Sequence, residues 1–155
     1  MKKYTVGVDI GGGHILSAIV DNNENRLLDE TKSYVKVNNK GTFDEIMTSW
    51  SSALNQSIKH VDPKELEGIG FAMPGAFNYK EGVGMFEEGN KKYLALYKVN
   101  IREALTPYLE TDIQLPFRYL NDATAFAVGE AWVGKAKGAS KSIAVTLGTG
   151  LGSAF

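Results

Sequence analysis

Three consecutive glycines separate two short apolar segments near the start of the chain, in the stretch VGVDIGGGHILSAIVD from Val6 to Asp21. Residues 4–10 and 14–20 are mostly apolar, which predicts two strands. The glycines would join them as a hairpin whose backbone N–H groups an anion can approach closely, since no side chains intervene. Asp9, at the end of the first strand, is placed to hold Mg²⁺ beside such an anion. The alternative is an ordinary tight hairpin with a surface aspartate.

A second turn of the same kind follows the apolar segment 142–147, where the sequence reads GTGLG and begins with Gly148, Thr149 and Gly150. Neither glycine turn opens a helix, and neither carries a Lys-Ser/Thr pair. This excludes the nucleotide loop of P-loop enzymes and the dinucleotide fingerprint. Two glycine turns that face each other across a cleft would hold a phosphate chain from both sides. Because the second strand-turn-strand unit has barely begun at Phe155, we expect the chain to be part of a longer protein.

Between the two turns the sequence predicts alternating strands and helices. A helix begins after Thr42, because Thr42 and Glu45 form a capping box ahead of apolar residues on one face. The other predicted elements are a polar third strand at 26–37, a strand at 69–73, a loop at 76–98, a helix at 100–109 capped by Asn100, a strand at 117–120 and a helix at 123–133. The order of three strands, helix, strand, helix, strand and helix predicts an α/β domain with a mixed sheet, followed by the first strand of a second unit.

Composition narrows the class of protein. Hydrophobic residues make up 43% of the 155 residues, so we expect a folded core. A net charge of -1 argues against nucleic acid as the main partner. The absence of cysteine excludes disulfides and thiolate metal sites in this chain. No apolar run reaches the roughly 18 residues of a membrane span. We therefore expect a cytoplasmic protein with no membrane partner.

Asn121 and Asp122 stand between a predicted strand and a predicted helix. Open α/β sheets place catalytic groups at this position. Phosphoryl transfer to an alcohol needs a carboxylate that accepts the hydroxyl proton. Asp122 fits that role, and Asn121 can hydrogen-bond a neighbouring sugar hydroxyl. The alternative is that Asp122 only caps the helix.

Pro74 and Gly75 end the predicted strand at 69–73 and begin the long loop. A glycine at this point allows the backbone to approach a sugar closely, and the alternative is a plain turn. A loop of this length is uncommon unless it is functional. Its polar candidates for substrate contact are Asn78, Glu87, Glu88, Asn90 and Lys92.

Together these motifs resemble the ROK family of sugar kinases, which have the ribonuclease H-like fold of the actin-like ATPases. GVDIGGGH is similar to the family's first phosphate motif, MPG to its sugar-side turn, NDATAFAVGE to its catalytic Asn-Asp helix and LGTGLG to its second phosphate motif. The resemblance spans nearly the whole chain. It implies phosphorylation of a hexose or related sugar by ATP with Mg²⁺, in a protein that is a homodimer at full length. Residues 1–137 would form the N-terminal lobe, and residues 138–155 would begin the second lobe.

The resemblance also assigns roles to individual residues. Asp122 would be the general base and would contact the substrate together with Asn121. The rest of the sugar site would include Gly75, Gly84 and Asn90. The residues that would face the phosphates are Asp9, Gly11, Gly12, Gly13, His14, Gly148, Thr149 and Gly150, with Asp9 on the magnesium side. A lone histidine such as His14 is more often structural.

Gly13 departs from the family pattern, which usually has Thr or Ser there. That hydroxyl would contact phosphate, so its loss favours a second hypothesis, a non-catalytic sugar-sensing or regulatory protein. A third hypothesis, an actin-like or chaperone-like ATPase without a sugar substrate, is disfavoured by Pro74-Gly75 and Asn121-Asp122. In the family, the zinc motif and the adenosine-binding half lie beyond the position of Phe155. We therefore expect neither within this chain, and no efficient kinase activity from the chain alone.

Overall fold

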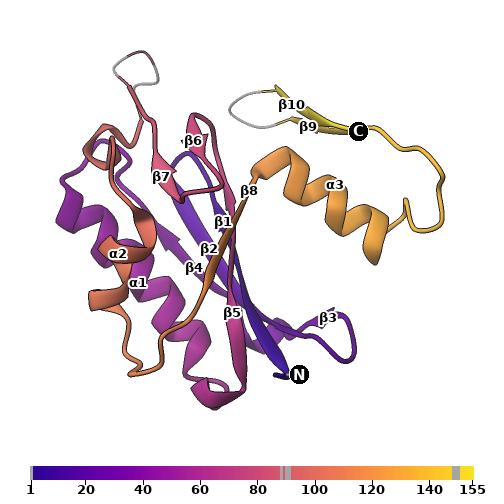
Figure 1. Cartoon of the computed structure of the whole chain (residues 1–155), viewed down its shortest axis with the longest axis horizontal. Coiled ribbons are helices and arrows are strands. Elements are labelled where there is room, and N and C mark those ends of the chain that lie inside the picture. The colour runs from indigo at the N-terminus through magenta and orange to yellow at the C-terminus, as the bar shows by residue number, and fades with distance from the viewer. Residues whose placement is uncertain (1, 88, 90–91, 148–150) are drawn as a thin grey trace.

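The computed structural model describes residues 2–87, 89, 92–147 and 151–155. Its centre is a mixed six-stranded sheet (Figure 1). The strands are β1 (Tyr4–Ile10), β2 (His14–Asp21), β3 (Arg26–Leu27), β4 (Ser33–Lys36), β5 (Leu66–Met73) and β8 (Phe117–Asn121). They are ordered β3-β2-β1-β5-β8, and β4 also pairs with β2. β1 is antiparallel to β2 and parallel to β5, and β5 is parallel to β8. The α/β fold with a mixed sheet is thus confirmed.

The third predicted strand, at 26–37, is interrupted, so the prediction of one continuous strand is wrong. β3 and β4 both pair antiparallel with β2, but a short 3-10 helix, η1 (Asp29–Thr31), separates them. Thr31 causes the break, because its Oγ1 accepts a hydrogen bond from Ile19 N at 2.8 Å and donates one to Leu28 O at 2.6 Å. A side chain thereby replaces a ladder partner of β2.

One face of the sheet is covered by α1 (Phe43–Ile58), which begins with the predicted capping box. Thr42 Oγ1 accepts a hydrogen bond from Glu45 N at 3.3 Å, and Glu45 Oε2 accepts one from Thr42 N at 2.7 Å. The buried face of α1 includes Trp50, which is fully enclosed. Burying an aromatic side chain of this size contributes strongly to the core.

The same face also carries α2 (Ile101–Leu105), shown beside α1 in Figure 1. Asn100 caps it as predicted, since its Oδ1 accepts a hydrogen bond from Glu103 N at 3.1 Å. The predicted helix at 100–109 is shorter than expected, because its second half is the 3-10 helix η5 (Thr106–Tyr108). Another 3-10 helix, η2 (Pro63–Glu65), precedes β5.

The described residues within 76–98 form a packed segment and not an open loop. A small hairpin joins β6 (Phe77–Asn78) to β7 (Val83–Gly84), and the 3-10 helix η4 (Leu94–Leu96) follows. Phe86, Tyr93 and Leu96 are each at most 1% exposed. The glycines and charged residues between them leave no clean helical or strand period across the segment, which explains why the sequence pattern suggested a loop.

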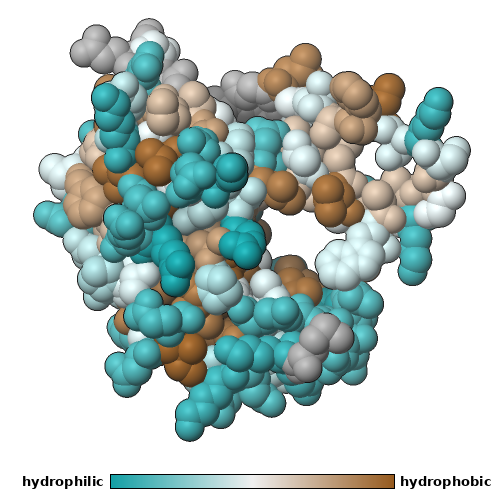
Figure 2. Space-filling model, viewed as in Figure 1, coloured by the Kyte–Doolittle hydropathy of each residue, from teal (hydrophilic) through white to brown (hydrophobic). Residues whose placement is uncertain are grey.

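The opposite face of the sheet carries α3 (Asp122–Trp132) and, beyond it, an antiparallel hairpin of β9 (Ala144–Leu147) and β10 (Leu151–Ala154). Apolar side chains in this part remain exposed, as Figure 2 shows. They include Phe126, Trp132, Leu147 and Leu151. The division of the chain into two lobes between residues 137 and 138 stays a prediction. No helix within the described ranges has both the length and the apolar character needed to cross a membrane.

Candidate active site

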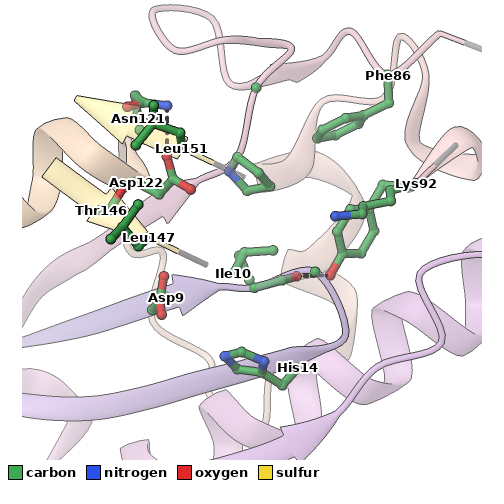
Figure 3. A pocket seen from close by; sticks show the side chains of 16 residues that line it. Asp9, Ile10, His14, Phe86, Lys92, Asn121, Asp122, Thr146, Leu147 and Leu151 are labelled. Atoms are coloured by element: carbon green, nitrogen blue, oxygen red, sulfur yellow. Dashed lines mark hydrogen bonds between the residues drawn. The ribbon is translucent and has the colours of Figure 1, made fainter. Parts of the chain in front are cut away.

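The parallel strands β1, β5 and β8 end at one edge of the sheet, and a pocket of about 610 Å³ opens there (Figure 3). The carboxyl edge of parallel strands is the usual ligand site in open α/β sheets. Segments distant in the sequence therefore meet around one cavity. The pocket is lined by Asp9, Ile10, Gly11, Gly12, His14, Pro74, Gly75, Phe86, Lys92, Tyr93, Asn121, Asp122, Thr146, Leu147, Leu151 and Gly152.

Asn121, and not Asp122, is the N-cap of α3. Asn121 Oδ1 accepts hydrogen bonds from the backbone N–H groups of Ala123 at 3.1 Å and Thr124 at 3.3 Å. This corrects the alternative in which Asp122 only caps the helix. Asp122 is the first residue of α3, and its Oδ1 accepts a hydrogen bond from Ala123 N at 2.8 Å. The carboxylate is thus held at the start of a helix, where the helix dipole stabilises negative charge.

Asn121 also orients the Asp122 carboxylate. Its Nδ2 donates to Asp122 Oδ1 at 2.9 Å and to the Tyr79 hydroxyl at 3.3 Å. That hydroxyl in turn donates to Met73 O at 3.3 Å. Within the described ranges, Asp122 Oδ2 accepts no hydrogen bond, which leaves one carboxylate oxygen for a proton from substrate. Contact between Asn121 and a sugar stays a prediction, since its polar atoms already have protein partners.

Asp9 brings a second carboxylate to the pocket (Figure 3). Its side chain is exposed toward the cavity, yet the surrounding protein removes enough water that burial raises its pKa above the ordinary value. His14 opposes this shift, and the nearby Asp122 carboxylate adds to it by like-charge repulsion. The two carboxylates therefore lie close enough to influence each other.

A permanent metal cage is absent from the part of the chain that the structure describes, where no three His, Cys, Asp or Glu side chains are grouped to hold an ion. Mg²⁺ usually keeps several waters and takes one or two carboxylates together with substrate phosphates. Asp9, with Asp122 beside it in the same pocket, supplies this kind of donor set. The residues present fit an ion that arrives with phosphate.

The glycine turn presents its carbonyl groups to the protein. Gly11 O accepts a hydrogen bond from the Tyr93 hydroxyl at 2.7 Å, Gly12 O accepts one from Asn39 Nδ2, and Gly13 O accepts one from Val37 N at 2.9 Å. The N–H groups of Gly12 and Gly13 donate to no acceptor within the described residues. Of these two residues, Gly12 lines the pocket and Gly13 does not. A backbone N–H group left free at the edge of a pocket is suited to bind an anion.

Close approach explains the glycine at position 11. Neither Gly11 nor Gly13 has a positive φ, so a left-handed turn is not the reason for the glycines. A Cβ on Gly11 would collide with the imidazole of His14, which stacks on the Tyr34 ring with the ring centroids 5.2 Å apart. A Cβ on Gly13 would find Val37 O as its nearest neighbour, at 4.0 Å. Position 13 therefore has room for a side chain.

Several pocket residues were not identified from the sequence. Phe86 and Tyr93 belong to none of the motifs, and the hydroxyl of Tyr93 meets the glycine turn only through a long-range contact with Gly11 O. Burial raises the pKa of Tyr93 to about 12, so its hydroxyl remains a donor at neutral pH. Lys92, a polar candidate in the predicted loop, does line the pocket. Its ammonium is the kind of group that phosphate or a sugar hydroxyl can contact.

Among the predicted sugar-site residues, Gly75 lines the pocket and Gly84 does not. A Cβ on Gly84 would collide with Leu96 O, so close packing accounts for that glycine. Asn90 lies outside the described residues, as do Gly148, Thr149 and Gly150 of the second glycine turn. Leu147 and Leu151, on either side of that turn, line the same pocket as Gly11 and Gly12. The roles of all these residues stay predictions.

A family model described as "ROK family" matches residues 5–155, which is nearly the entire chain. The chain belongs to the ROK family. This confirms the resemblance that the four sequence motifs suggested. The ROK match also covers every segment that contributes to the pocket, from Asp9 to Gly152.

Glucokinases are among the ROK relatives of this chain. It is 33% identical to a glucokinase of Streptomyces coelicolor over 152 residues, covering 96% of the chain and 42% of the relative. It is 30% identical to a glucokinase of Halalkalibacterium halodurans over 155 residues, covering 97% of the chain and 43% of the relative. The chain thus spans less than half the length of these curated relatives.

A solved structure agrees with the ROK fold. The ROK family glucokinase from Streptomyces griseus, crystallised with glucose and AMPPNP, matches with a TM-score of 0.76 and 28% identity. The match covers 97% of this chain and 43% of that glucokinase. The fold expected from the sequence, a lobe of the kind found in actin-like ATPases, is therefore confirmed.

Proposed function

We propose that this chain forms the N-terminal lobe of an ATP-dependent sugar kinase that phosphorylates a hydroxyl of a hexose or related sugar. One observation carries the proposal: the Asp122 carboxylate and Gly12, whose N–H group is free of protein acceptors among the described residues, line one pocket. A base for an alcohol and donors for a phosphate are the two requirements of phosphoryl transfer. The glucokinases among the relatives support the same reading. A homodimeric state and a cytoplasmic location remain predictions for the full-length protein.

In the proposed reaction, Asp122 accepts the proton of the attacking sugar hydroxyl. The sugar oxygen forms a bond to the γ-phosphorus of ATP, and the bond from that phosphorus to the β,γ-bridging oxygen breaks to release ADP. Asn121 keeps the carboxylate in position through its 2.9 Å hydrogen bond, which leaves Oδ2 as the atom for the proton. The N–H groups of Gly12 and Gly13 would donate to phosphate oxygens. Positioning and charge stabilisation supply most of the catalysis in such reactions.

Asp9 would hold Mg²⁺, directly or through water, on the phosphate side of the pocket. When bound, the ion neutralises negative charge that develops on the phosphate oxygens. The raised pKa of Asp9 fits this role, because a partly desolvated carboxylate gains more from a nearby cation than a fully hydrated one. We assign no part of this role to His14, whose ring packs against Tyr34.

The apolar lining of the pocket would limit hydrolysis of ATP. Ile10, Phe86 and Leu147 line the same cavity as Asp122. Water competes with the sugar hydroxyl as acceptor, and closure of two lobes over a bound sugar would exclude it. The remainder of the full-length protein would supply the second lobe.

The test is a panel of sugars with Mg²⁺ and ATP, assayed on the full-length protein and on its Asp122→Asn variant. Loss of the general base should lower kcat by about 10²- to 10⁴-fold, with the sugar KM changed much less. Asp112→Asn is the matched control, because it removes an exposed carboxylate away from the pocket. Wild-type activity in Asp122→Asn would refute the assignment of the base.

The alternative function, a non-catalytic sugar sensor, rests on Gly13. The position where the family usually has a hydroxyl offers none, although a side chain would fit there. Sugar binding by the full-length protein with no ATP turnover on any sugar of the panel would favour the sensor. Phosphorylation of one sugar would exclude it.

A further inference from the structure

The hydroxyl of Tyr93 reaches across 82 positions of sequence to the glycine turn. Tyr93 is 1% exposed, and its Oη donates to Gly11 O at 2.7 Å. Its ring packs edge-on against Trp50 and lies 5.7 Å from the Phe86 ring, centroid to centroid. Its backbone N donates to Asn39 O at 2.7 Å. Since the ring is fixed on several sides, the hydroxyl is a rigid tether for Gly11.

A tether on a carbonyl also sets the direction of the next N–H. The C=O of Gly11 and the N–H of Gly12 belong to one planar trans peptide and point in opposite directions. Because Tyr93 holds the Gly11 carbonyl toward the protein, the Gly12 N–H is turned the other way, and Gly12 lines the pocket. Asn39 acts in the same manner one peptide later, where its Nδ2 holds Gly12 O and thereby sets the Gly13 N–H.

We propose that Tyr93 and Asn39 are positioning residues that hold the glycine turn in its phosphate-binding orientation, each through one carbonyl. Without the tether, the peptide between Gly11 and Gly12 can rotate and bring a carbonyl oxygen to the pocket, where it would repel phosphate. Free glycines offer little resistance to such a rotation. The inference rests on the proposed function for the identity of the ligand, a nucleoside triphosphate with Mg²⁺.

The experiment measures the dissociation constant of Mg·ATP by calorimetry on the full-length protein, so that it does not depend on turnover. Tyr93→Phe keeps the ring against Trp50 and Phe86 and removes only the hydroxyl. We expect its Mg·ATP dissociation constant to rise about tenfold, as for loss of a hydrogen bond that orients a donor to a charged group. Asn39→Leu, which removes the second tether, should give an increase of similar size.

Tyr97→Phe is the matched control. Tyr97 lies in the same segment, is 40% exposed, and its hydroxyl makes no hydrogen bond to the described residues. We expect its Mg·ATP dissociation constant to equal that of the wild type within about twofold. A purely structural effect of Tyr93→Phe would weaken sugar binding as much as Mg·ATP binding. We expect the sugar dissociation constant to remain close to that of the wild type, while Tm falls by a few degrees because a buried hydrogen bond is lost.

Two results would overturn the inference. One is an unchanged Mg·ATP dissociation constant in Tyr93→Phe, and the other is a wild-type protein that binds no Mg·ATP. The first result would overturn the inference alone, whereas the second would overturn the proposed kinase as well. In a third outcome, the wild type binds Mg·ATP and Tyr93→Phe weakens that binding as expected, while the wild type phosphorylates no sugar. This combination would support the positioning role and refute the kinase.

Discussion

The side chain of Asn121 is joined to the carboxylate of Asp122 by a hydrogen bond of 2.9 Å from Nδ2 to Oδ1. The same asparagine caps α3 with its other polar atom, Oδ1. One residue therefore links the stability of the helix to the orientation of the proposed base. These two tasks use different atoms, so substitutions can separate them.

Asn121→Ser should keep the cap and lose the hydrogen bond to Asp122. Serine is as good a helix cap as asparagine, whereas alanine costs about 1 kcal/mol of stability. We therefore expect Asn121→Ala to lower the free energy of unfolding by about 1 kcal/mol and Asn121→Ser to change it little. Both should lower kcat by about tenfold, because the carboxylate keeps only the hydrogen bond from Ala123 N and is oriented less precisely. Thermal unfolding and steady-state kinetics on the full-length protein check this, and full activity in Asn121→Ser would contradict it.

Asp9→Asn should stabilise the folded protein and remove its activity. Burial raises the folded-state pKa of Asp9 above its ordinary value, His14 opposes this shift, and the nearby Asp122 adds to it. Between the unfolded and folded pKa values the folded state binds more protons, so stability falls as pH rises through that window. The loss persists at pH 7, where wild-type Asp9 is ionised. An asparagine carries no such penalty, and Tm at pH 7 should exceed that of the wild type.

The pH dependence identifies the cause of that stabilisation. The difference in Tm between Asp9→Asn and the wild type should shrink as the pH is lowered through the raised pKa of Asp9, where the wild-type carboxylate becomes protonated. Without a carboxylate on the phosphate side, kcat/KM for ATP should fall by about 100-fold or more. A difference in Tm that stays constant with pH would point to packing instead of charge.

Local patterns predicted most of the fold, and long-range contacts account for what they missed. The capping box of Thr42 and the cap of Asn100 could be predicted from the sequence, because each uses residues three positions apart. The break in the third strand depends on Thr31 meeting Ile19 across the sheet, and no local pattern signals it. The role of Tyr93 was not predicted either, because its hydrogen-bond partner Gly11 lies 82 residues away in the sequence. Asp9 and Asp122 were identified because a carboxylate at a strand end is a local feature.

Gly13→Thr should tighten nucleotide binding. The φ angle of Gly13 is outside the left-handed region, and a Cβ there would lie 4.0 Å from Val37 O, so the backbone accepts a side chain. The new hydroxyl would lie next to the free N–H groups of the turn and could donate a hydrogen bond to phosphate. We expect this bond to lower the Mg·ATP dissociation constant about fivefold to tenfold. Gly13→Val has the same shape without the hydroxyl and is the control. Equal affinities for the two variants would show that the hydroxyl has no role here.

Gly75→Ala and Gly84→Ala should separate a glycine that lines the pocket from one required by packing. Gly75 lines the pocket, and a Cβ there would meet only the Tyr79 hydroxyl, at 3.9 Å, an ordinary contact distance. We expect Gly75→Ala to leave Tm within about 2 °C of the wild type and to raise the sugar KM several-fold. The added methyl would occupy space that the sugar approaches.

Gly84→Ala should show the reverse pattern. Its Cβ would collide with the carbonyl of Leu96, and the hydrogen bonds from Gly84 N to Val99 O at 3.0 Å and from Lys98 N to Gly84 O at 2.8 Å resist a shift of the backbone. We expect a loss of about 1 to 3 kcal/mol of stability, with the sugar KM of the remaining folded protein close to that of the wild type. Thermal unfolding and sugar kinetics on both variants check the pair. A stable Gly84→Ala variant with a raised sugar KM would instead indicate that Gly84 belongs to the sugar site.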